Sequence, residues 1–75
     1  MIIKILGGGC ANCDKLEANA REAVEAMGKE ATFEKVKDFG AIMGYGVMKT
    51  PALVIDEEVK VSGRVASVDD IKKFL

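Results

Sequence analysis

GGGCANCDKL, residues 7–16, contains the two cysteines of the chain, Cys10 and Cys13, and directly follows the apolar run MIIKIL. That run is rich in β-branched residues and apolar on both faces, which is typical of a strand covered by helices, so we expect a strand at residues 2–6. The glycines end this strand, and a helical pattern begins directly after them. The sequence therefore predicts a strand, a glycine turn and a helix, with the cysteine pair at the junction.

The helix after the cysteines has the clearest pattern in the sequence. From Ala11 to Met27 apolar residues recur at helical spacing, while charged residues occupy the opposite side. Gly28 is a typical helix stop. The apolar face is expected to consist of Leu16, Ala20, Ala23, Val24 and Met27.

The middle of the chain predicts a strand followed by a short helix. ATFEKV, residues 31–36, alternates well enough to form a half-buried strand with Phe33 as its apolar anchor. Asp38 is placed to cap the N-terminus of the next helix, which glycines weaken. That helix carries Ile42, Met43 and Tyr45.

Two further strands are expected around the acidic turn at residues 56–58. PALVID precedes this turn, and VKVS follows it with Val59 and Val61 alternating against Lys60 and Ser62. An alternating strand with a lysine on its open face suits the edge of a sheet. We therefore expect a hairpin whose second strand is an edge strand.

The C-terminal residues 67–75, SVDDIKKFL, predict a final amphipathic helix. Ser67 is an N-cap, acidic residues follow in the first turn, and Val68, Ile71, Phe74 and Leu75 share one face. The element order is then βαβαββα, with parallel pairing across the first helix. We expect an α/β fold, a four-stranded mixed sheet flanked by helices, in one domain spanning residues 1–75.

Composition excludes several classes of partner. The 75 residues are 49% hydrophobic, and 11 basic against 12 acidic residues leave a net charge of −1. Such a balance provides no continuous positive field for nucleic acid or anionic lipid. The N-terminal apolar run is too short for a signal peptide or a membrane span, so a cytoplasmic location is expected.

The position of the CxxC motif favours thiol chemistry. The backbone N–H groups of Asn12 and Cys13 and the helix dipole favour a thiolate at Cys10, and such cysteines have pKa values lowered from about 8.5 to roughly 3.5–7.5. Cys13, three residues later, lies on the same helical face and is the resolving thiol. No histidine is present to act as a base. Asp14 opposes this activation, because its carboxylate would repel a thiolate if it turned towards Cys10.

Two alternatives remain for the cysteine pair. Two soft thiolates in a short loop can also hold copper or zinc, and GGGCANC resembles the loop of heavy-metal-associated domains. Those domains end on a strand and usually have a methionine where this chain has Gly8, whereas this chain ends on a helical pattern. The third interpretation is a pair of buried structural thiols.

The element order, the CxxC motif and Thr50-Pro51 before a strand together resemble the thioredoxin-like superfamily. More narrowly, CANC, LEANAREAVE and GRVAS resemble the redox-active disulfide protein 2 family. The tryptophan before the first cysteine and the proline between the cysteines, usual in thioredoxins, are missing, and so is the motif tyrosine of glutaredoxins.

This resemblance implies further site residues and partners. It implies a cis peptide bond at Pro51, a Thr50 backbone that pairs with an extended substrate, and a Gly63 that lets partners approach. For Tyr45, Val47 and Met48 two interpretations stay open: the apolar rim of this groove, or part of the core, where a stripe of this kind is more often found. The expected activity is thiol–disulfide exchange by a monomer without a cofactor. Its partners would be a disulfide-containing protein or glutathione disulfide, and an unidentified reductase or low-molecular-weight thiol.

Overall fold

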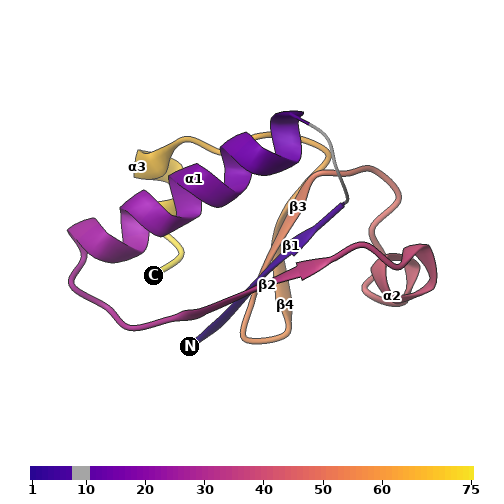
Figure 1. Cartoon of the computed structure of the whole chain (residues 1–75), viewed down its shortest axis with the longest axis horizontal. Helices are drawn as coiled ribbons and strands as arrows, with labels where there is room; N and C mark the ends of the chain where they lie inside the picture. Colours follow the sequence, from indigo (N-terminus) through magenta and orange to yellow (C-terminus); the bar gives the residue numbers. More distant parts are fainter. Residues whose placement is uncertain (8–10) are drawn as a thin grey trace.

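The computed structural model describes residues 1–7 and 11–75. It confirms the predicted order βαβαββα, and Figure 1 shows the helices arranged around a twisted sheet. The elements are β1 (Ile2–Leu6), α1 (Ala11–Ala26), β2 (Thr32–Val36), α2 (Phe39–Gly44), β3 (Ala52–Ile55), β4 (Glu58–Ser62) and α3 (Val68–Lys72).

The sheet is mixed and has four strands in the order β2-β1-β3-β4. β1 pairs parallel with β2 across α1, and β3 pairs antiparallel with β4, both as expected. β3 also pairs antiparallel with β1. Leu6 lies opposite Ala52 in the β1–β3 register. The glycine turn after β1 and the Thr50-Pro51 segment before β3 are therefore brought to the same end of the sheet.

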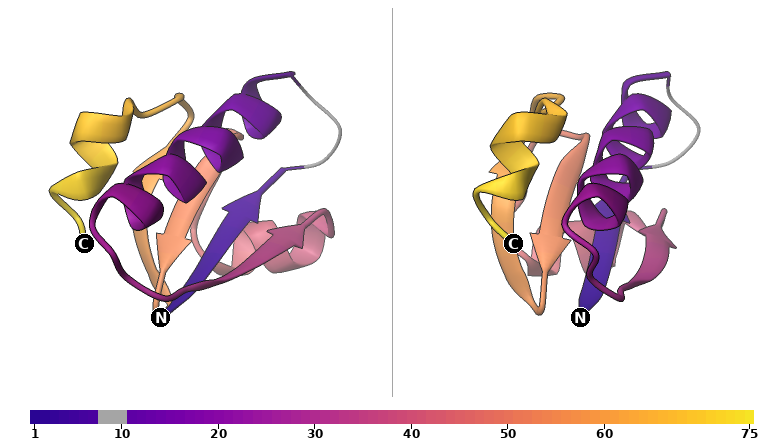
Figure 2. Two further views of the ribbon diagram at one scale, coloured as in Figure 1. Left: turned by 60° about the vertical axis from the view of Figure 1, so that its left-hand side comes forward. Right: turned by 90° about the vertical axis from the view of Figure 1, so that its left-hand side faces the viewer.

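Two hydrophobic clusters cover the two faces of the sheet. On one face, Ile3, Ile5 and Leu53 pack with buried residues of α1 and α3, which run side by side in Figure 2. On the other face, Leu6 and Val54 pack with Ile42 of α2 and with Val47. The central strands β1 and β3 are thus covered from both sides, which explains why their sequences are apolar on both faces.

Two details of the predicted apolar pattern are wrong. Val59 and Val61 do not share a face, because a β-bulge lies between their partners: Leu53 pairs with Val61 and Val54 with Val59. The extra residue, Lys60, shifts the alternation by one, so Val61 is buried and Val59 is exposed. Met27 is also exposed, because α1 ends at Ala26 and the chain turns away at Gly28.

Both predicted helix caps are present. The Asp38 carboxylate accepts a hydrogen bond from the Ala41 N–H at 3.1 Å, and the Ser67 hydroxyl oxygen accepts one from the Asp70 N–H at 3.1 Å. Each cap satisfies a backbone donor that the first helical turn leaves unpaired. These contacts are local, which is why residue type and spacing were sufficient to predict them.

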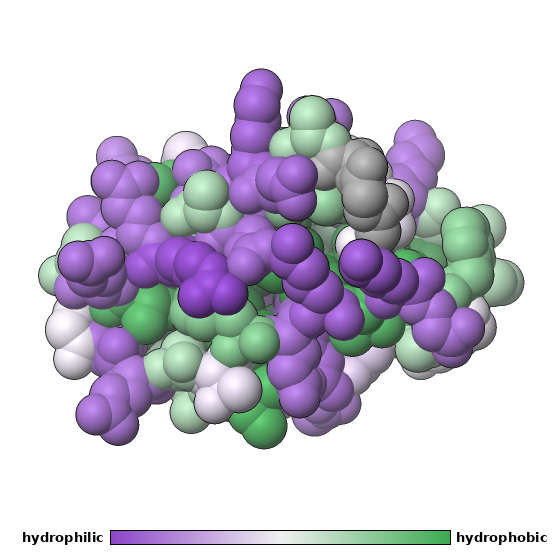
Figure 3. Space-filling model, viewed as in Figure 1, coloured by the Kyte–Doolittle hydropathy of each residue, from purple (hydrophilic) through white to green (hydrophobic). Residues whose placement is uncertain are grey.

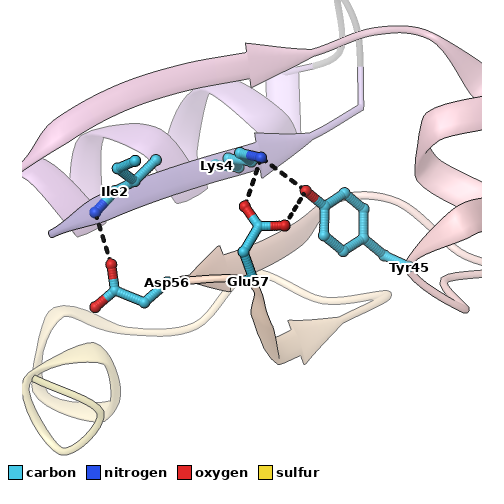
Figure 4. Close-up of polar contacts among 5 residues, drawn as sticks. All are labelled: Ile2, Lys4, Tyr45, Asp56 and Glu57. Atoms are coloured by element: carbon cyan, nitrogen blue, oxygen red, sulfur yellow. Dashed lines mark hydrogen bonds and ion pairs between the residues drawn. The ribbon is translucent and has the colours of Figure 1, made fainter.

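The turn between β3 and β4 is held against β1 by its own side chains. Asp56 and Glu57 both have positive φ, 49° and 69°, an uncommon conformation for residues other than glycine. The Asp56 carboxylate accepts from the Ile2 N–H at 2.9 Å, and the Glu57 carboxylate accepts from Lys4 Nζ at 2.7 Å and from the Tyr45 hydroxyl at 3.0 Å (Figure 4). These bonds offset the backbone strain of the turn.

Lys4, Tyr45 and Glu57 form a closed polar triangle on the α2 face of the sheet. Lys4 Nζ also donates to the Tyr45 hydroxyl at 2.8 Å, so the triangle joins β1, the end of α2 and the β3–β4 turn. The hydrogen bond from Lys4, supported by the one from Tyr45, holds the pKa of Glu57 below its ordinary value of 4.5. The hydrogen bond to Glu57, followed by the one to Tyr45, holds the pKa of Lys4 well above its ordinary value.

The lowered pKa of Glu57 predicts a loss of stability in acid. The folded state favours the carboxylate, so this stabilisation is complete above pH 4.5 and is lost as the pH falls through the folded-state pKa. Denaturant unfolding at a series of pH values from 7 to 3 measures this decline in the free energy of unfolding. Glu57→Gln should lower stability at pH 7 and flatten the acid decline. Glu30→Gln, at an exposed carboxyl that makes no ion pair within the described residues, is the control and should leave the pH profile unchanged.

Candidate active site

Gly7 is the point at which three segments of the site meet. Its N–H donates to the carbonyl of Val36 at 2.9 Å, which ends β1 beside β2, and its φ is +125°. A Cβ placed on Gly7 would lie 2.8 Å from Cys13 Sγ and 3.0 Å from Thr50 Cβ. The absence of a side chain therefore allows the first turns of α1 and the segment before β3 to approach each other across the end of β1.

Cys13 lies on the inner side of α1 and is buried. It is disulfide-bonded, and its sulfur faces the Cα of Gly7. Cys10, the predicted nucleophile, lies outside the residues that the structure describes. The described part of the site thus consists of the predicted resolving cysteine and its surroundings.

Thr50, Pro51 and Gly63 come together beside Cys13. The Thr50–Pro51 peptide bond is cis, Pro51 is buried and Thr50 is exposed. The carbonyl of Pro51 accepts a hydrogen bond from the Gly63 N–H at 2.9 Å, which joins the start of β3 to the end of β4. Four predicted site residues, Cys13 among them, therefore occupy one end of the sheet although up to 50 positions separate them in the sequence.

Asp14 is paired with a cation on β2. Its Oδ1 lies 3.7 Å from Lys35 Nζ, which also contacts Glu17 Oε1 at 2.9 Å. The hydrogen bond to Glu17 raises the pKa of Lys35 above its ordinary value, so the ammonium stays charged at neutral pH. The sequence identified Asp14 as a source of repulsion, but it could not show that a lysine 21 positions later, in a different element, lies beside it.

The three residues expected to form an apolar rim lie in different environments. Val47 is only 2% exposed and belongs to the cluster under α2, and the Tyr45 hydroxyl is bound to Lys4 and Glu57. Met48 is 91% exposed. Figure 3 shows hydrophobic surface at the end of the molecule where α2 lies, and Phe39 and Met43 of that helix are exposed as well.

The sequence reasoning did not single out Gly7 or Lys49. The available signal for Gly7 was its position between the last strand residue and the CxxC motif, where the chain must turn in a confined space. Nothing in the sequence distinguished Lys49 except its position before Thr50.

Among the described residues, no three Cys, Asp or Glu side chains gather to form a metal site. No helix in residues 1–7 and 11–75 has the length and apolar character needed to cross a membrane.

A βαβαββα fold in which a cysteine of a CxxC motif and a cis-proline segment meet at the same glycine defines a thioredoxin-like protein. The family model described as thioredoxin domain matches residues 1–75, so the chain belongs to this family. A thioredoxin of Methanothermobacter thermautotrophicus is 52% identical over 75 residues, which cover all of this chain and 97% of that protein. A thioredoxin of Methanocaldococcus jannaschii is 35% identical over 75 residues, covering all of this chain and 86% of that protein. The chain is a thioredoxin-family thiol–disulfide oxidoreductase.

The close approach at Gly7 predicts a large cost for a single methyl group. Gly7→Ala places a Cβ 2.8 Å from Cys13 Sγ at a φ of +125°, so we expect a loss of roughly 2–4 kcal/mol in the free energy of unfolding. Disulfide exchange should also slow, because Cys13 and Thr50 are forced apart. Denaturant unfolding and an insulin-reduction assay measure the two effects.

Gly28→Ala is the matched control for this variant. Gly28 also has a positive φ, +66°, but a Cβ there meets no atom within 4 Å. Gly28→Ala should therefore lower the free energy of unfolding only by the cost of the backbone conformation, roughly 1–2 kcal/mol, and should leave the rate of disulfide exchange unchanged. Equal losses of stability and exchange in the two variants would contradict the role given to the close approach.

Proposed function

We propose that Cys10 is the nucleophile and Cys13 the resolving thiol of the exchange reaction. The Cys10 thiolate attacks one sulfur of a substrate disulfide, which forms a mixed disulfide and releases the first substrate thiolate. The Cys13 thiolate then attacks Cys10 and releases the second. Two electrons and two protons pass to the substrate, which leaves as two thiols, and the protein is left with a Cys10–Cys13 disulfide.

The observation that carries this assignment is the burial of Cys13, whose sulfur lies against Gly7. A buried sulfur is shielded from external disulfides, which suits a thiol whose target is an intramolecular mixed disulfide. Cys10, three residues earlier, would then meet the substrate first. No cofactor is required, because the electrons move directly between sulfur atoms.

We further propose that the substrate binds as an extended segment along Thr50. Thr50 is exposed beside the buried Pro51, so its backbone is available to pair with an added strand, and Gly63 adjoins it through the bond to Pro51. The substrate is a disulfide-containing protein or glutathione disulfide. A reductase or a low-molecular-weight thiol restores the dithiol, and the protein acts in the cytoplasm as a monomeric single domain of residues 1–75.

Single cysteine variants test the division of labour. Cys10→Ser should abolish insulin-disulfide reduction, because no nucleophile remains, whereas Cys13→Ser should accumulate a mixed disulfide that a reductant releases. Mass spectrometry under non-reducing conditions detects that adduct. An adduct formed by Cys10→Ser and not by Cys13→Ser would reverse the two roles. Stoichiometric copper or zinc after purification without chelator, together with no exchange, would instead favour the metal-binding alternative.

Lys35 offsets the repulsion between Asp14 and the proposed thiolate. Asp14 follows Cys10 by four residues, a spacing that brings side chains together on a helix, and a carboxylate there disfavours a negative sulfur. The Lys35 ammonium, 3.7 Å from Asp14 Oδ1, compensates that charge. The reactivity of Cys10 should therefore depend on the Asp14–Lys35 pair and not on Asp14 alone.

A double-mutant cycle measures this compensation. Lys35→Met should slow alkylation of Cys10 by iodoacetamide at pH 7 by about two- to fivefold, and Asp14→Asn should accelerate it. In the Asp14→Asn background, Lys35→Met should have a smaller effect, because no uncompensated carboxylate remains. Lys60→Met, which removes the partner of Glu58 on β4, is the control. The same Lys35→Met effect in both backgrounds would disprove the coupling.

A further inference from the structure

Lys49 is held beside the cis-proline segment by its contact with Gly63. Three carbons of its aliphatic stem lie close to where a Gly63 Cβ would be: Lys49 Cβ at 3.0 Å, Cδ at 3.5 Å and Cγ at 3.8 Å. Gly63 thus leaves room for the lysine stem to run across it, and a larger residue there would displace the stem. The Gly63–Pro51 hydrogen bond keeps this arrangement adjacent to Thr50.

The charge of Lys49 is not neutralised within the described structure. Lys4, Lys35 and Lys60 each contact a carboxylate within 3 Å, whereas Lys49 forms no ion pair with any residue in ranges 1–7 and 11–75. Arg64, the residue after Gly63, is 57% exposed on its side chain and reaches Asp70 only at 3.8 Å. The strip formed by Lys49, Thr50, Pro51, Gly63 and Arg64 therefore carries excess positive charge, although the whole chain has a net charge of −1.

We propose that Lys49 is a specificity-determining residue that selects disulfide substrates with acidic side chains next to the reacting cysteine. This inference rests on the proposed function, in which an extended substrate pairs with the Thr50 backbone. A side chain of that substrate next to its cysteine passes the Lys49 stem, where an ammonium without a partner attracts a carboxylate and repels a cation. Because the stem packs on Gly63, less side-chain entropy is lost when the pair forms.

The experiment uses three disulfide-linked peptides that differ only in the residues flanking the cysteine, which are Glu, Gln or Lys. The pre-reduced full chain is assayed with each peptide, and kcat/KM is measured at low ionic strength and in 0.5 M salt. The wild type should prefer the Glu peptide to the Gln peptide by about two- to fivefold and disfavour the Lys peptide. The preference should shrink in high salt, since ions screen exposed charges.

Three variants assign the preference to one side chain. Lys49→Met keeps an unbranched stem over Gly63 and should remove the preference without changing kcat/KM for the Gln peptide. Lys49→Glu should reverse the preference in favour of the Lys peptide. Lys73→Met, an exposed lysine after α3 that forms no ion pair within the described residues, is the control and should behave as the wild type.

The outcomes separate this inference from the proposed function. Equal kcat/KM for all three peptides, or a preference that survives Lys49→Met, overturns the role of Lys49 while exchange itself remains. Failure of the pre-reduced wild type to reduce any of the peptides or insulin overturns the proposed function and this inference together. A preference lost in Lys49→Met and reversed in Lys49→Glu supports it.

Discussion

The missing side chain of Gly7 is the constraint on which the site depends. β1 ends there, α1 packs its Cys13 sulfur against it, and the segment before β3 brings Thr50 to its other side. These three segments are far apart in the sequence, and a single Cβ would occupy the space in which they meet. Their close approach brings the Cys13 sulfur and Thr50, the residue before the cis-proline, next to the same glycine.

The opposite end of the sheet is held by polar contacts instead of close backbone packing. Lys4, Tyr45 and Glu57 join β1, α2 and the β3–β4 turn, and Asp56 adds a bond to Ile2 (Figure 4). α2 has only six residues, too few to be stable in isolation. The triangle and the buried side chains of Ile42 and Val47 therefore hold α2 against its face of the sheet.

Electrostatics distinguishes the two sides of the site. On the α1 side, Lys35 pairs with Asp14 and Glu17, and Arg21 also pairs with Glu17, so two carboxylates meet two cations near the helix start. On the β3–β4 side, Arg64 reaches the Asp70 carboxylate at 3.8 Å, and Lys49 forms no ion pair with any residue that the structure describes. A thioredoxin-family protein with a nearly neutral chain can thus present a locally positive surface to its substrates, because the arrangement of charges, and not their sum, sets the local field.

Residue type and short-range spacing were sufficient to determine much of this protein. The helical period of α1, the caps at Asp38 and Ser67, the edge position of β4 and the place of Cys13 near the start of α1 all depend on residues a few positions apart, and the structure agrees with each. The βαβαββα order then led to the correct family. These features are local, so the sequence contains them directly.

Only the tertiary structure decided the contacts between distant residues. The bulge at Lys60 puts Val59 and Val61 on opposite faces of the sheet, Lys35 lies beside Asp14, and Lys49 lies across Gly63. Val47 belongs to the core under α2, whereas Met48, the next residue, is exposed. In each case the deciding neighbour belongs to another element, because strand register and helix packing bring together atoms whose separation in the sequence indicates nothing about their distance in space. The sequence alone therefore determined the elements and the family, and the packing of those elements determined which side chains lie near Cys13.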